Sequence, residues 1–199
     1  MRQMNGMDHN ADIKYIEQVL GGRIESFGYL VDRYKDRTYN LALRVCGNRE
    51  EAEEVAQDVF MKVFRSLKGF KKKSSFATWI YRIAYNTAIS YVRNKKKSVL
   101  SLEDFPADVS DFGGINISEA EAEKEYRNAL VNFALKKINE DERGLITLFY
   151  YEEMNTEEIS VLTGISKSNV KVKLFRARQK MLEIIKNVEK KKFKYHEQA

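Results

Sequence analysis

The scarcity of turn-forming residues is the feature that most limits how this chain can fold. Its 199 residues include one proline and ten glycines. A β-sandwich or β-barrel of this length needs many tight turns, and such turns rely on glycine and proline. The sequence therefore predicts an all-α protein, and its length allows one domain or two small ones.

The composition narrows the class of protein further. Hydrophobic residues make up 43% of the chain, which excludes global disorder, and no apolar run approaches the ~20 residues of a membrane span. Residues 1–10 are polar and lack the apolar stretch of a secretory signal. The single cysteine, Cys46, has no disulfide partner and is expected to be a small buried hydrophobe near a helix end. We expect a cytoplasmic protein with no membrane insertion, metal or cofactor.

Charge divides the chain into three parts. Residues 1–97 carry a net charge of +8, residues 98–125 carry −7, and residues 126–199 carry +5. The acidic part holds Pro106, the only proline, and a pair of glycines, as is typical of a linker. The sequence thus predicts two small helical domains joined by a flexible acidic linker. The predicted division is an N-terminal segment 1–23, a first domain 24–97, a linker 98–125, a second domain 126–187 and a basic tail 188–199.

Capping residues and apolar periodicity locate the helices. Gly47 is a plausible helix stop, and the pairs Asn48 and Glu51, Ser118 and Glu121, Asn139 and Glu142, and Asn155 and Glu158 are capping boxes. One helix after Asn48 has the core face Val55, Val59, Phe60, Val63, Phe64 and Leu67; the next, after a loop at 69–75, has Phe76, Ile80, Ile83, Thr87 and Tyr91. The second domain is expected to hold about four short helices, with a frayed tail after Lys186.

A helix-turn-helix pattern covers residues 156–181. Gly164 supplies the left-handed backbone that a short turn needs, and Ser166 is a good N-cap for the second helix. A helical wheel places Val170, Leu174, Ala177 and Met181 on the core face and Val172, Phe175 and Arg176 away from it, with lysines on both flanks. An exposed apolar residue beside an arginine is typical of a major-groove reader. The candidate duplex-binding residues are Lys167, Ser168, Lys171, Val172, Lys173, Phe175, Arg176 and Arg178.

The first domain contains a long stretch without acids. Residues 59–102 include no Asp or Glu but eleven Lys or Arg, with aromatic residues interleaved. Trp79, Arg82, Asn86 and Arg93 fall on one stripe beside the core face. Aromatic rings can stack on unpaired bases while cations hold the backbone, so the stretch favours single-stranded nucleic acid. Taken one at a time, the aromatic residues are better explained as core.

Three segments, in two regions of the chain, carry a family resemblance. The run FATWIYRIAYNTA at residues 76–88 resembles region 2 of bacterial sigma factors of the extracytoplasmic-function (ECF) class, and EAEEVAQDVF at 51–60 resembles the polymerase-binding helix of the same family. The segment VKVKLFRAR at 170–178, within the helix-turn-helix, resembles region 4. The order of the motifs, the linker and the total length also fit this family.

The resemblance implies a sigma factor that binds core RNA polymerase and directs promoter-specific initiation. The first domain would dock on the clamp coiled coil of the large subunit through Gln57, Asp58, Phe60, Lys62 and Arg65. It would melt the minus-ten element with Lys71, Lys72, Lys73, Ser74, Ser75 and Phe76 of the loop, together with Trp79, Arg82, Asn86 and Arg93. The second domain would bind the minus-thirty-five duplex and the polymerase flap, and an anti-sigma factor is an expected partner.

Three other functions compete with this interpretation. A one-component helix-turn-helix regulator explains residues 156–181 but not the acid-free stretch. A nuclease needs a cluster of carboxylates for metal ions, which the basic stretch lacks. An anti-sigma factor or structural adaptor leaves the two basic surfaces without a purpose. We therefore expect a DNA-binding protein without enzymatic activity.

Overall fold

The computed structural model describes residues 9–96 and 119–196, and these form helices with no strand among them. The elements are α1 (His9–Leu20), η2 (Ile24–Ser26), α2 (Phe27–Cys46), α3 (Arg49–Ser66), η3 (Leu67–Gly69), α4 (Phe76–Lys96), α5 (Glu119–Lys137), α6 (Glu140–Ile146), η4 (Thr147–Tyr151), α7 (Thr156–Thr163) and α8 (Lys167–His196). The all-α prediction is therefore confirmed. The predicted linker and the expected cap at Ser118 fall mostly or wholly outside the described residues. No described helix is long and apolar enough to cross a membrane.

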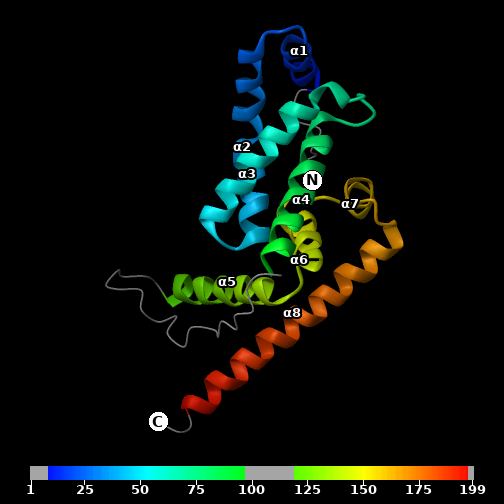
Figure 1. Cartoon of the computed structure of the whole chain (residues 1–199). Helices are drawn as coiled ribbons and strands as arrows, with labels where there is room; N and C mark the ends of the chain where they lie inside the picture. Colours follow the sequence, from blue (N-terminus) through cyan, green and yellow to red (C-terminus); the bar gives the residue numbers. More distant parts are fainter. Residues whose placement is uncertain (1–8, 97–118, 197–199) are drawn as a thin grey trace.

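Helices α2, α3 and α4 form the bundle at the top of Figure 1, with α1 across its upper end. Gly47 ends α2 in the left-handed conformation, with φ 78°, as the sequence predicts. The Asn48 side chain accepts from the backbone N–H of Glu51 at 3.1 Å and starts α3. Local capping signals therefore fix where this bundle turns.

The predicted core faces of α3 and α4 are largely confirmed. Val55, Val59, Val63 and Leu67 are buried on α3, but Phe60 is only half-buried and Phe64 is exposed, so the prediction for Phe64 is wrong. On α4, Phe76, Ile80 and Thr87 are buried, and Ile83 and Tyr91 are half-buried. Helix α4 also buries a second face that the sequence did not indicate, made of Tyr81, Tyr85, Ile89 and Val92. That face exists because α6 and α7 pack on α4 from the other half of the chain.

Helix α1 lies in the segment that the sequence left without a predicted element. Its Asp12 is buried, accepts a 2.6 Å hydrogen bond from the Tyr34 hydroxyl and pairs with Arg33 at 3.1 Å. Burial raises the pKa of the Tyr34 phenol, so this hydroxyl stays protonated and donates. The pair therefore fastens α1 to α2.

An Asp12→Ala variant should lose about 1–3 kcal/mol of unfolding free energy, because the buried Tyr34 hydroxyl is left without its acceptor. Tyr34→Phe in the Asp12→Ala background should cost little more, since no unpaired hydroxyl remains. Urea unfolding of the two single variants and the double variant measures the coupling. Additive losses would contradict a shared buried bond.

The second half of the chain differs in part from its prediction. Asn139 and Asn155 cap α6 and α7 as expected, with Glu142 and Glu158 donating their backbone N–H groups. Helices α5 and α8 are long rather than short, and the predicted fraying after Lys186 is wrong because α8 continues to His196. Helix α6 lies beside the lower end of α4, and α8 runs diagonally below α6 (Figure 1).

Candidate nucleic-acid interface

The helix-turn-helix is built by α7, a short turn and the first half of α8. Asn155 and Glu158 complete a capping box at the start of α7. Gly164 ends α7 in the left-handed conformation, with φ 76°, which an L side chain adopts only with strain. The Ser166 hydroxyl accepts from the backbone N–H of Asn169 at 3.4 Å at the start of α8. The predicted turn residues therefore have the predicted local roles.

The outward face of α8 agrees with the helical wheel. Val170, Leu174 and Ala177 are buried, and Met181 is half-buried. Phe175 is 57% exposed and Val172 44% exposed on the opposite side, so two apolar side chains point away from the core. Such side chains are available to the thymine methyl groups of a major groove.

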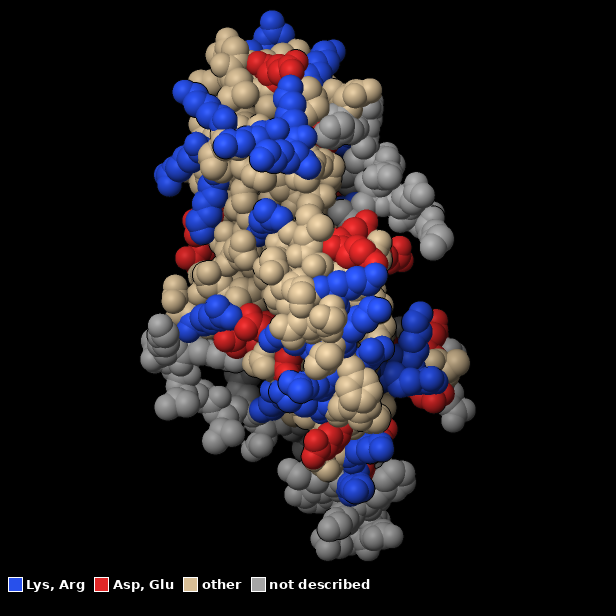
Figure 2. Space-filling view, turned by 90° about the vertical axis from the view of Figure 1, so that its right-hand side faces the viewer, with Lys and Arg blue, Asp and Glu red and all other residues tan. Residues whose placement is uncertain are grey.

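Cations surround this apolar pair. Ser168, Lys171 and Arg176 are exposed and Lys173 is half-buried. Lys167 forms an ion pair with Glu157 of α7, and Arg178 donates to the Tyr150 hydroxyl at 3.2 Å. Figure 2 shows Lys and Arg gathered at the top of one face of the molecule and again over its lower half, with smaller acidic groups among them. On α8, Lys167 and Arg178 therefore contact other side chains of the protein, while Lys171 and Arg176 are exposed to solvent.

The loop before α4 presents three exposed lysines, Lys71, Lys72 and Lys73. Lys72 has a left-handed backbone, with φ 55°, and its ammonium group pairs with Glu17 of α1 at 2.7 Å. Ser74 and Ser75 are half-buried, and the Ser75 hydroxyl accepts from the backbone N–H of Thr78 at 3.1 Å. Helix α1 therefore contacts the middle of this cationic loop, and the cap of α4 fixes its last residue.

Phe76 requires a correction as a candidate base contact. Its ring is fully buried and packs edge-on against Tyr34 and Phe70 at centroid distances of 5.4 and 5.5 Å. Trp79 is half-buried and rests on Phe70 and Phe76 at 5.3 and 5.7 Å. Phe76 therefore supports the indole from below, and only Trp79 of this aromatic cluster reaches the surface.

A groove between α3 and α4 brings together residues that were predicted for two different tasks. Exposed Asn86 of the predicted base-binding set lines it with Lys62 and Arg65 of the predicted polymerase-binding set. The groove has a volume of about 430 Å³, and its other lining residues are Ser66, Ile83, Thr87 and Ser90. Lys62 donates to the Thr87 hydroxyl at 3.2 Å. No carboxylate lines this groove, so it offers donors to an anionic or carbonyl-rich partner.

The outer face of α3 carries the remaining polymerase-binding candidates. Gln57 and Asp58 are exposed, like Lys62 and Arg65, while Phe60 is half-buried. Met61, which is 51% exposed on this face, was not among the predicted contacts, and Phe64, which was predicted to be core, is 38% exposed beside it. Met61 lies four residues after Gln57 and four before Arg65, so helical spacing from the candidates themselves could have found it.

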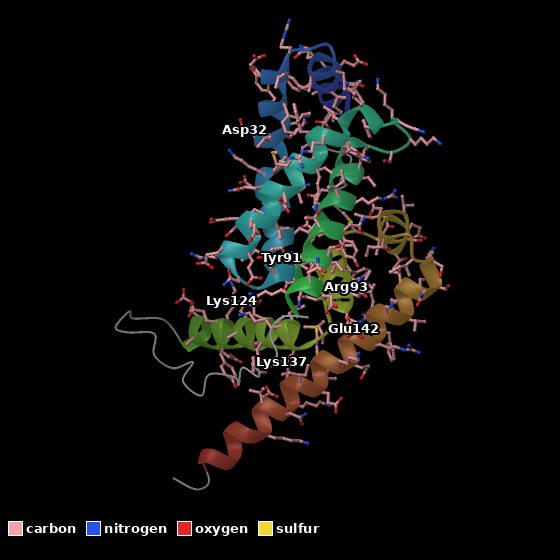
Figure 3. The ribbon with its side chains drawn as sticks, viewed as in Figure 1. Asp32, Tyr91, Arg93, Lys124, Lys137 and Glu142 are labelled. Atoms are coloured by element: carbon pink, nitrogen blue, oxygen red, sulfur yellow. The ribbon has the colours of Figure 1, made fainter. Side chains whose placement is uncertain are left out.

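The remaining two candidates, Arg82 and Arg93, turn toward the second half of the chain. Arg82 donates through Nε to the carbonyl of Leu162 at 3.1 Å and through Nη2 to that of Val161. Arg93 Nη2 lies 2.6 Å from Asp141 Oδ2, and Figure 3 places Arg93 at the lower end of α4. Both guanidinium groups therefore contact oxygen atoms of the second half of the chain.

The described part of the chain offers few side chains for metal binding or thiol chemistry. No cluster of three or more His, Cys, Asp or Glu side chains is placed to hold a metal ion there. Cys46 is half-buried at the end of α2, and burial raises the pKa of its thiol to about 12. The thiol is thus protonated and unreactive at neutral pH.

Comparisons with known proteins agree with both motifs. The family Sigma-70 region 2 matches residues 30–98, and Sigma-70, region 4 matches residues 129–181. The chain is 30% identical to the ECF RNA polymerase sigma factor SigW of Bacillus subtilis, over 88% of this chain and 97% of SigW. It is 29% identical to the ECF RNA polymerase sigma-E factor of Escherichia coli K12, over 82% of this chain and 88% of that protein.

Solved structures share the same fold. CnrH in complex with the cytosolic domain of CnrY superposes with a TM-score of 0.62, at 22% identity over 89% of this chain and 98% of CnrH. The sigma factor RpoE of Bartonella quintana, in complex with the anti-sigma factor NepR, gives a TM-score of 0.60 at 19% identity, covering 81% of this chain and 98% of RpoE. The family assignment removes the regulator, nuclease and adaptor alternatives, since sigma factors direct RNA polymerase and are not enzymes. The two regions in order, and the relatives that span nearly the whole chain, show that this protein belongs to the ECF class of sigma-70 family RNA polymerase sigma factors.

Proposed function

We propose that α7 and α8 bind the minus-thirty-five element as duplex DNA, with α8 in the major groove. The observation that carries this proposal is the outward pair Val172 and Phe175 beside Arg176. Arginine can hold guanine through two hydrogen bonds, and the apolar pair can contact thymine methyl groups. The candidates Lys167, Ser168, Lys171, Lys173 and Arg178 hold phosphates on either side.

The first region opens the minus-ten element and holds its unpaired bases. Trp79, supported by Phe76, offers a stacking surface, and Asn86 offers hydrogen bonds to a base edge. The lysines and serines at 71–75 hold the DNA backbone. Arg82 and Arg93 add two cations once they are released from Val161, Leu162 and Asp141. Stacking on an aromatic ring is worth about 1–3 kcal/mol per base, which offsets the few kcal/mol that unstacking costs.

The outer face of α3 docks on the clamp coiled coil of the large polymerase subunit. Met61 and Phe64 supply apolar contacts at the centre of this face, flanked by Gln57, Asp58, Phe60, Lys62 and Arg65. A small apolar centre with a polar rim is typical of protein interfaces. The second region contacts the polymerase flap, and the acidic linker runs toward the RNA exit path.

An anti-sigma factor holds this protein inactive, by analogy with the solved complexes of its structural relatives. The proposed domain boundaries of the sigma factor are a first region 24–97, a linker 98–125, a second region 126–187 and a tail from 188, close to the two family matches. The place of action is the cytoplasm, where promoter DNA and RNA polymerase meet.

Run-off transcription tests the proposed function directly. Purified protein added to core RNA polymerase on a promoter library should give specific transcripts, from which the minus-ten and minus-thirty-five sequences can be read. Core polymerase alone is the control. Equal output with and without the protein would contradict the proposal.

Arg176→Ala should cost about 1–3 kcal/mol of discrimination at one base position of the minus-thirty-five element. Lys173→Ala should weaken binding equally on all sequences and lower the salt slope by about one, because it removes a phosphate contact. Titrations of duplex variants at several salt concentrations separate the two effects. Losses that are equal and independent of sequence in both variants would remove Arg176 as a base reader.

Asn86→Ala should leave the thermal midpoint and the affinity for core polymerase nearly unchanged, because Asn86 is exposed. Transcription from a duplex promoter should fall, and a template with a pre-melted bubble should restore only the part of the defect due to strand opening. Asn94→Ala, also exposed on α4, is the matched control. Full activity of Asn86→Ala on the duplex promoter would contradict base capture by this residue.

A further inference from the structure

The two sigma regions are packed against each other through a continuous set of contacts. One hydrophobic core includes Tyr81, Tyr85 and Ile89 of α4 together with Leu145 and Leu162 of the second region. Polar contacts cross the same surface: the guanidinium group of Arg44 in α2 lies 3.5 Å from the ring centroid of Tyr151, and Arg143 Nη1 donates to the Val45 carbonyl at 2.7 Å. The described structure is therefore a closed arrangement of the two regions.

Gly144 of α6 is the point of closest approach. A Cβ atom added there would lie 2.6 Å from Cε2 of Tyr85 and 3.0 Å from Cδ1 of Ile89. Both side chains are buried on α4, so the Tyr85 ring has little room to move aside. Closure at this distance thus requires a residue without a side chain, although glycine is a poor helix former.

The closed arrangement engages two cations of the minus-ten set. Arg82 donates to the carbonyls of Val161 and Leu162, near the end of α7, where the helix dipole is negative. Arg93 pairs with Asp141, and its Nε lies 3.6 Å from Glu140. These oxygens occupy the donors that DNA phosphates would need, so each cation serves either the second region or the DNA.

We propose that the free protein masks part of its own minus-ten surface: α6 and α7 close on α4 at Gly144, and Arg82 and Arg93 bind DNA only after the two regions separate. The assignment of these cations to DNA rests on the proposed function; the closure itself does not. Helix α7 is also the first helix of the helix-turn-helix, so opening moves that unit away from α4, while the outward face of α8 is already exposed in the closed arrangement. Promoter DNA and closure therefore compete for the same guanidinium groups.

Energy transfer between two fluorophores tests the closure in the full chain. Cysteines at exposed Lys68 and Gln179 carry the labels, with Cys46 replaced by alanine. Gly144→Ala should lower the transfer efficiency, since its methyl group strains the interface while alanine favours α6 itself. Gly28→Ala is the matched control, because nothing lies within 4 Å of a Cβ there, and it should match the wild type.

Binding of a single-stranded minus-ten oligonucleotide, taken from the run-off promoters, tests the masking. Gly144→Ala should bind it about threefold or more tightly than the wild type, because a larger fraction of the protein is open. Asp141→Asn, which removes the charge of the half-buried partner of Arg93, should shift both readouts in the same direction by less; Asp32→Asn, in the exposed pair with Lys35, is its control. Circular dichroism checks that each variant keeps its helices, and Asp141→Asn remains informative should Gly144→Ala unfold.

The outcomes separate the two proposals. Equal transfer efficiency in the wild type and in folded Gly144→Ala overturns the closure at Gly144. Lower transfer without tighter oligonucleotide binding overturns the masking of Arg82 and Arg93. If transfer falls as expected while core polymerase gives no specific transcript with the wild type, the closure stands and the proposed function fails.

Discussion

An Arg143→Ala variant should lose on the order of 3 kcal/mol or more of unfolding free energy, the largest effect that we expect from one substitution outside the apolar core. The Arg143 side chain is 4% exposed and donates to four carbonyls: Leu135 at 2.8 Å, Lys136 at 2.7 Å, Ile138 at 3.3 Å and Val45 at 2.7 Å. Burial lowers the pKa of this guanidinium group, but arginine stays charged in proteins. Its removal leaves buried carbonyls at the ends of α2 and α5 without donors.

Urea unfolding, followed by circular dichroism, measures this loss. Arg143→Lys should recover only part of the stability, since one ammonium group cannot reach four carbonyls on different sides. Arg127→Ala, which breaks an exposed pair with Glu123, is the control and should cost at most about 0.5 kcal/mol. A loss in Arg143→Ala no larger than in Arg127→Ala would show that water replaces the guanidinium group at little cost.

A Phe76→Ala variant should lose about 3–5 kcal/mol of unfolding free energy, because the ring is fully buried among Tyr34, Phe70 and Trp79. Its transcription defect should follow from lost folding and from an unsupported Trp79. Phe76→Leu keeps most of the volume and should cost much less stability. Thermal unfolding and run-off transcription of the two variants, measured below both midpoints, distinguish the roles.

A direct base contact by Phe76 has a different signature. Phe76→Leu would then lose transcription in full while it keeps most of its stability, because leucine has no ring to stack. Asn86→Ala offers the opposite comparison, with little change in stability and a specific loss of activity. The two positions thus separate support of the site from contact with DNA.

Local features of the sequence were sufficient for the capped starts of α3, α6 and α7, for the glycine ends of α2 and α7, and for the face of α8. A cap such as Asn48 or Asn155 acts on backbone groups two or three residues away, so nearby residues reveal it. The exposure of Val172 and Phe175 follows from periodicity along a single helix. The same local reasoning missed α1, although Ile16 and Val19 share its buried face; the bond from Tyr34 to Asp12, which joins residues 22 positions apart, depends on the tertiary structure.

What the sequence by itself determined was therefore the helical class, the capped helix ends, the helix-turn-helix and its outward side chains. Only the tertiary structure decided that Phe76 supports Trp79, that Arg143 is buried, and that Arg82 faces the second region. The Arg82 contact with Leu162 spans 80 positions, and the Arg143 contact with Val45 spans 98. Periodicity shows that a helix has an apolar face, but the second buried face of α4 depends on which distant helix packs there, and at Gly144 on the absence of a single Cβ atom.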